Sequence, residues 1–176
     1  MHNTEDKNWW VIEYRKKEDD FVNLVAPKLG LRAEINPEKE TNPFAPDLIV
    51  NGQIADLKCQ QTPFFKSYIF YKIPNQFAVT FNHKDYINYG EKHPDITIYY
   101  WIDWQELSKT ISGETFVVQP MSGIWRVHFS RIKAMIETQK TNLHTYQRRT
   151  EDSVGNAKDS YVFDLRSFEN LFLKEN

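Results

Sequence analysis

The dipeptide Asn51-Gly52 constrains the fold of this chain more than any other local feature. An apolar run lies on each side of it, and both central residues of a type I′ turn need positive φ, which Asn and Gly adopt readily. We therefore predict two antiparallel strands joined by a two-residue loop. Such a loop fixes the pairing of the strands and places Asp47 directly opposite Asp56.

This register puts two carboxylates side by side on one face of the predicted hairpin. Lys58 lies two residues beyond Asp56 and shares that face, whereas Leu57 and Cys59 point to the opposite, apolar face. Opposed like charges destabilise a sheet, so we expect that one carboxylate is protonated, that the turn differs from the predicted one, or that a cation lies between them. Mg²⁺ prefers such oxygen ligands, and a neighbouring ammonium can orient or deprotonate a water. The hairpin therefore predicts metal-assisted hydrolysis of phosphodiesters.

Pro46-Asp47, an eight-residue gap and Asp56-Leu57-Lys58 resemble the motif of the PD-(D/E)xK nuclease superfamily, which includes restriction endonucleases and junction resolvases. The resemblance covers about residues 10 to 60. It implies that Asp47 and Asp56 are metal ligands, together with the carbonyl oxygen of Leu57. It also implies that Lys58 is the base or electrostatic helper that positions the attacking water, and that Mg²⁺ is the cofactor, with Mn²⁺ able to substitute.

An N-terminal helix of that superfamily often supplies a further acidic residue. Apolar spacing here predicts a helix over residues 9–29 that ends at Gly30. We choose Glu18 as its acidic residue, and Glu13, Asp19 and Asp20 stay open as alternatives.

The rest of the chain mixes helical and strand patterns, which predicts an α/β or α+β class. We expect a mixed central sheet flanked by helices, as in restriction endonucleases, and a single domain over residues 1–176. Further strands are expected at 31–35, 77–81, 95–103, 114–120 and 161–165, and further helices at 83–92, 130–149 and 167–173.

Several absences bear on the compartment. No apolar run approaches the roughly 18 residues of a membrane span, and the polar start of the chain lacks the pattern of a secretory signal. The single cysteine excludes an intramolecular disulfide framework and a multi-cysteine zinc site. These features predict a cytoplasmic protein without a membrane partner.

The net charge of −2 conceals a basic segment, because residues 126–149 carry six Lys and Arg against one Glu. The predicted helix 130–149 would present basic side chains on its polar side, either to DNA phosphates or merely to solvent. Gln60 and Lys66 follow the motif closely and are expected near the scissile backbone. The predicted nucleic-acid contacts are Gln60, Lys66, Lys133, Lys140 and Arg148.

Together these features predict a Mg²⁺-dependent endonuclease that cuts double-stranded DNA as a homodimer, with type II restriction as the role that the resemblance implies. Repair, junction cleavage and mobile-element roles stay open. One alternative is an inactive nuclease-like fold that binds nucleic acid or a protein partner. Another is a domain whose motif is accidental, which predicts that Asp47 and Asp56 lie far apart.

Overall fold

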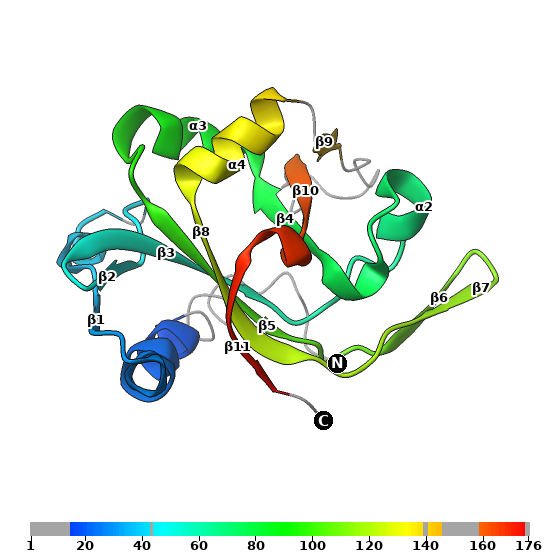
Figure 1. The fold of residues 1–176 in the computed structure, drawn as a ribbon, viewed down its shortest axis with the longest axis horizontal. Helices are drawn as coiled ribbons and strands as arrows, with labels where there is room; N and C mark the ends of the chain where they lie inside the picture. The colour runs from blue at the N-terminus through cyan, green and yellow to red at the C-terminus, as the bar shows by residue number, and fades with distance from the viewer. Residues whose placement is uncertain (1–14, 43, 139–140, 146–158, 175–176) are drawn as a thin grey trace.

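A computed structural model describes residues 15–42, 44–138, 141–145 and 159–174 (Figure 1). Its centre is a six-stranded mixed sheet in the order β1-β2-β3-β5-β8-β11, so the predicted fold class is confirmed. β3 and β5 run parallel, and every other neighbouring pair of this sheet is antiparallel. The six strands are β1 (Ala33–Ile35), β2 (Leu48–Val50), β3 (Gln53–Gln60), β5 (Thr97–Asp103), β8 (Ser122–His128) and β11 (Glu169–Lys174).

Both faces of this sheet are covered, and alternate residues of β5 show it. Ile98 and Tyr100 pack into a large core with helices α3 and α4 and with a second sheet, ordered β4-β10-β9. Tyr99 points the other way, into a smaller core beneath Phe21. Figure 1 shows α3, α4 and β10 on one side of the central sheet and the N-terminal helical segment on the other. These elements are α3 (His83–Lys92), α4 (Phe129–Glu137), β4 (Ala78–Asn82), β9 (Asn142–His144) and β10 (Ser160–Asp164).

The predicted hairpin is confirmed in its turn and in its register. Asn51 and Gly52 have φ values of 51° and 80°, as a type I′ turn requires. Leu48 pairs with Ala55, which places alternate residues on the faces expected from the sequence. The Asn51 side chain also accepts a hydrogen bond from the backbone N–H of Arg32, which ties the turn to the chain just before β1.

The N-terminal helix changes type along its length. Residues 15–20 are α-helical, and η1 (Phe21–Val25) and η2 (Ala26–Leu29) continue as a π-helix and a 3₁₀-helix. Pro27 lacks a backbone N–H, so the tighter last turn is compatible with its place there. The segment ends at Gly30, with φ of 69°, as predicted. Residues 9–14 of the predicted helix lie outside the described part of the chain.

The predicted helix 130–149 is wrong beyond its first half. α4 ends at Glu137, and Asn142–His144 form β9, which pairs with β10. The edge of β10 that β4 does not occupy supplies the hydrogen bonds of this strand. Residues 139–140 and 146–149 lie outside the described residues. Of the three nucleic-acid contacts predicted on this helix, Lys133, Lys140 and Arg148, only Lys133 therefore lies on the observed α4.

The C-terminal segment is also a correction. Residues 167–173 were expected to be helical, but Glu169–Lys174 form β11 at the edge of the central sheet, antiparallel to β8. Pairing with a distant strand overrides the local helical pattern here.

The strand β8 was itself not predicted from the sequence. Elements that were not predicted, besides β8, are α2 (Ser67–Tyr71), β6 (Ser108–Ile111), which pairs with β7 (Glu114–Val117), and the 3₁₀-helices η3 (Pro37–Glu40), η4 (Asn75–Phe77) and η5 (Leu165–Ser167).

None of the helices in the described part of the chain has the length and apolar character that crossing a membrane requires.

Candidate active site

A cleft of about 680 Å³ lies where β3 meets β4, α3 and the segment that leads into β2. Three of the motif residues, Asp47, Asp56 and Lys58, line it. The remaining lining residues are Asn42, Phe44, Ala45, Leu57, Cys59, Gln60, Thr80, Asn82, Lys84, Asp85, Asn88, Tyr89 and Lys92.

One edge of the site is a lysine held between two carboxylates. The Nζ atom of Lys39 lies 2.5 Å from Oε1 of Glu18 and 2.5 Å from Oδ1 of Asp47. Lys39 belongs to η3, which Asn36 caps by accepting a hydrogen bond from the N–H of Glu38. The Asn36 side chain also donates to the carbonyl of Pro46, next to Asp47. The loop that carries Lys39 is therefore fixed against the start of β2.

Asp47 links the two strands of the hairpin. Its second oxygen, Oδ2, accepts a hydrogen bond of 3.2 Å from the backbone N–H of Leu57 in β3. The carboxylate thus reaches across to the residue that follows Asp56, and both acids line the same cleft. The prediction that Asp47 and Asp56 lie close together is confirmed. The alternative of an accidental motif predicts that these two residues lie far apart, and that prediction is wrong.

Asp56 and Lys58 form the floor of the cleft. Asp56 is 3% exposed, and its Oδ2 lies 2.7 Å from Nζ of Lys58, without the geometry of a hydrogen bond. The same ammonium donates a hydrogen bond of 2.7 Å to Oδ2 of Asp85, which α3 supplies. Tyr89, one turn further along α3, is buried beside this pair, with the Lys58 ammonium 5.9 Å from its ring centre.

The electrostatics of the site follow from burial and from opposite charges. Burial raises the pKa of Asp56 to about 6, against the opposing effect of Lys58 and with a contribution from nearby Asp47. Burial alone would lower the pKa of Lys58, but Asp56, Tyr89 and Asp85 raise it well above its ordinary value. The pKa of Lys39 is likewise raised, because Asp47 and Glu18 outweigh its desolvation. Both lysines are therefore held as ammonium ions.

The raised pKa of Asp56 predicts how the stability of the metal-free protein depends on pH. Between about pH 4 and pH 6 the folded state keeps a proton that the unfolded state has lost, so stability falls as the pH rises. A shift from 3.8 to about 6 corresponds to about 3 kcal/mol. Urea denaturation in EDTA at a series of pH values measures it. The difference between wild type and Asp56→Asn isolates this group, and a flat difference curve would contradict the burial of its charge.

Among the acidic residues weighed for the N-terminal helix, Glu18 is the one that joins the hairpin. It is buried and bound through Lys39 to Asp47. Asp19 is exposed and Asp20 half-buried, and neither pairs with Lys39. Glu13 lies outside the described residues.

The residues predicted to contact nucleic acid lie in different parts of the structure. Gln60 lines the cleft, where its side chain donates to the carbonyl of Thr80 in β4. Lys66 occupies the N-cap position of α2, without a capping hydrogen bond from its side chain, and does not line the cleft. Lys133 lies on the exposed face of α4, with its Nζ 3.8 Å from Oε1 of Glu137. Lys140 and Arg148 lie outside the described residues.

Burial raises the pKa of the Cys59 thiol to about 12, which suits an inert side chain.

Three residues of the site were missed from the sequence: Lys39, Asp85 and Tyr89. Asp85 and Tyr89 are four residues apart on a helix that was predicted with the correct limits, so their common face was available as a signal. Nothing in the sequence signals Lys39, because its position depends on how the polar segment 36–46 folds against Glu18.

The carboxylates are not arranged as a ready-made metal site. In the ranges that the structure describes, no group of three or more His, Cys, Asp or Glu has the mutual geometry to hold a metal ion. The ammonium of Lys39 lies between Glu18 and Asp47 and is the cation that these two carboxylates share.

A scan against protein-family models and searches of curated proteins and of solved structures found no match for this chain.

Proposed function

We propose that this chain is a Mg²⁺-dependent nuclease that hydrolyses the phosphodiester bonds of DNA. The observation that carries the proposal is the convergence of Glu18, Asp47, Asp56 and Lys58 from a helix and a hairpin onto one edge of the sheet. A buried carboxylate with a strongly raised pKa in a cleft is characteristic of functional sites, because such a group costs stability.

The chemistry of the donor set fits a divalent cation. Four carboxylates, from Glu18, Asp47, Asp56 and Asp85, face two ammonium groups, which leaves an excess of two negative charges. Oδ2 of Asp56 is a buried oxygen that accepts no hydrogen bond. Carboxylate oxygens are the ligands that Mg²⁺ takes together with substrate phosphates, so Asp47 and Asp56 would hold it, with Glu18 free to contribute once Lys39 withdraws.

When bound, Mg²⁺ would act as a Lewis acid on the phosphoryl group. Lys58 would stabilise the negative charge that develops on the phosphate oxygens, since its ammonium is held at a fixed position by Asp56 and Asp85. Asp85 acts through Lys58 and is therefore a positioning residue. Gln60, anchored on β4, would help to orient the strand that enters the cleft.

The alternative is a nuclease-like fold without catalysis that binds nucleic acid or a protein partner. The observation in its favour is that Lys39 and Lys58 already pair with all four carboxylates, so the network is closed without a metal. The two functions differ in their response to cations, because the network alone predicts no stabilisation by Mn²⁺. Restriction, a homodimer that cuts both strands of a duplex, and a cytoplasmic location stay predictions from the sequence.

Incubation of the purified chain with supercoiled plasmid and with circular single-stranded DNA tests the proposal. We expect nicked, linear or fragmented products with Mg²⁺ or Mn²⁺, and intact DNA with excess EDTA. Glu18→Gln is expected to lose the activity, whereas Asp19→Asn, an exposed acid one residue away, keeps it. Products that persist in EDTA, or that Glu18→Gln and Asp19→Asn form at the same rate, would contradict the proposed site.

A further inference from the structure

One side of α3 forms a wall of the cleft. Lys84, Asn88 and Lys92 are spaced by four residues, so their side chains follow one another along the helix, and all three line the cleft. Asp85 and Tyr89 lie on the adjoining stripe, which faces Lys58. One row of α3 side chains, Asp85 and Tyr89, thus lies against Lys58. The other row presents its amide and ammonium groups to the cleft.

The two lysines of this wall are available to an anionic ligand. Lys84 and Lys92 are both exposed, and within the described ranges neither forms an ion pair with a carboxylate. They are eight residues apart on the helix, which separates them by about 12 Å. At the axial rise of about 3.4 Å per nucleotide in one strand of a duplex, this length corresponds to about three or four nucleotides. Asn88, between them, can donate to a phosphate or to a base.

Phe44 lies across the cleft from this wall, on the segment between η3 and β2. Phe44 is 68% exposed, the largest exposed fraction among the large apolar residues of the described chain. Nζ of Lys84 lies 4.7 Å from the centre of its ring. The Lys84 side chain therefore reaches from α3 to the ring of Phe44. At this point the two sides of the cleft are separated by about the length of one lysine side chain, which is less than the diameter of a duplex.

From this juxtaposition we propose that Lys84, Asn88 and Lys92, with Phe44 opposite them, bind an unpaired stretch of nucleic acid and lead its backbone to Asp56 and Lys58. The two lysines bind phosphates that are a few nucleotides apart on the same strand, and the exposed ring of Phe44 stacks on a base, as aromatic side chains do in proteins that bind single strands. This inference rests on the proposed function only for the cleavage that would follow binding. It replaces α4 with α3 as the principal contact with the substrate.

Binding of fluorescein-labelled dodecathymidylate, measured by anisotropy in EDTA over a series of salt concentrations, tests the inference without any cleavage. The double variant Lys84→Gln, Lys92→Gln is expected to weaken binding at least tenfold and to reduce the salt dependence, by about 0.7 in logarithmic slope for each lost phosphate contact. Phe44→Ala is expected to weaken binding about fivefold or more with the slope unchanged, and Phe44→Trp to retain it.

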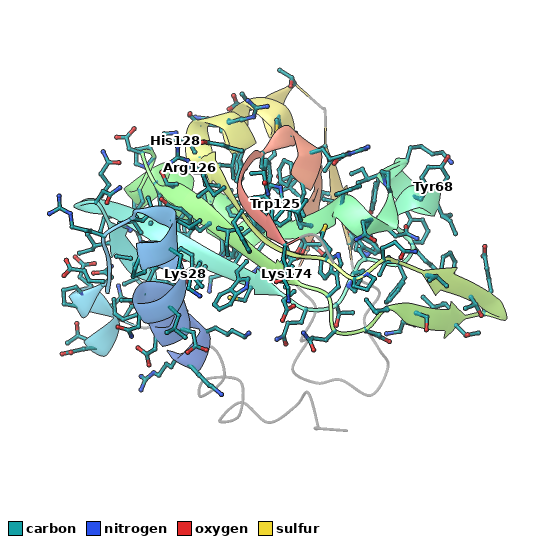
Figure 2. The ribbon with its side chains drawn as sticks, turned by 60° about the horizontal axis from the view of Figure 1, so that its bottom comes forward. Lys28, Tyr68, Trp125, Arg126, His128 and Lys174 are labelled. Carbon is teal, nitrogen blue, oxygen red and sulfur yellow. The ribbon has the colours of Figure 1, made fainter. Side chains whose placement is uncertain are left out.

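The matched control is the double variant Lys28→Gln, Lys174→Gln, which removes two exposed lysines of η2 and β11, both labelled in Figure 2 and neither lining the cleft. We expect it to bind the oligonucleotide as the wild type does. Equal losses in the two double variants would overturn the inference, as would tighter binding of the corresponding dA·dT duplex to the same residues. Oligonucleotide binding that depends on α3, with plasmid and circular single strands uncut in Mg²⁺, would refute the nuclease and leave this binding site standing.

Discussion

Lys58→Met is expected to cleave DNA about a thousandfold more slowly than the wild type at saturating Mg²⁺. Its ammonium lies 2.7 Å from both Asp56 and Asp85, and no other ammonium among the described residues pairs with Asp56. Removal of one preorganised group that stabilises the transition state costs about a hundredfold to a thousandfold in rate. Initial rates of plasmid nicking give the ratio.

Lys58→Met also leaves the buried Asp56 without its cation, so its folding has to be measured separately. We expect its unfolding midpoint in urea to fall at neutral pH and to recover partly near pH 5, where Asp56 takes up a proton. Asp85→Asn keeps the pair of Lys58 and Asp56 and is expected to lower the rate about tenfold with little change in substrate affinity. Lys109→Met, an exposed lysine of β6, is the control. A folded Lys58→Met that cuts at the wild-type rate would remove Lys58 from the reaction.

Lys39→Met is expected to destabilise the metal-free protein by about 2 kcal/mol and to make it dependent on divalent cations. Without the ammonium, the buried carboxylate of Glu18 and that of Asp47 face each other without a counter-ion. A divalent cation would then bind without displacing a lysine, so we expect its affinity to rise about tenfold or more. Thermal denaturation in EDTA and over a series of Mn²⁺ concentrations measures both effects, because a ligand of the folded state raises the midpoint.

Lys28→Met, on the exposed face of η2, controls for the loss of one surface lysine. We expect it to behave as the wild type in EDTA and in Mn²⁺. One result would contradict this account: Lys39→Met unfolds at the wild-type temperature in EDTA, and Mn²⁺ does not raise its midpoint. A cation between Glu18 and Asp47 would then not stabilise the folded protein.

The parts of the site that could be predicted from the sequence are those that a local turn determines. Asn51 and Gly52 fix the register of their own hairpin, and the register fixes which face carries Asp56 and Lys58. The helix predicted over residues 83–92 has the limits of the observed α3.

The remaining parts depend on contacts between distant segments. β11 is a strand because β8 offers it hydrogen bonds, and β9 interrupts the predicted basic helix because β10 does the same. Lys39 joins Asp47 to Glu18, which is 21 residues away from Lys39 in the chain. Asp85 binds Lys58, which is 27 residues away from it. No periodicity or local motif carries such information, so these contacts emerge only in the folded chain.

Isothermal titration of Mn²⁺ into the metal-free protein tests the central claim most directly, since the claim is that these carboxylates hold a divalent cation. The account predicts saturable binding to the wild type and to Asp19→Asn, and its loss in the double variant Asp47→Asn, Asp56→Asn with circular dichroism unchanged. Absence of binding to the wild type, or the same heats in the folded double variant, would contradict it.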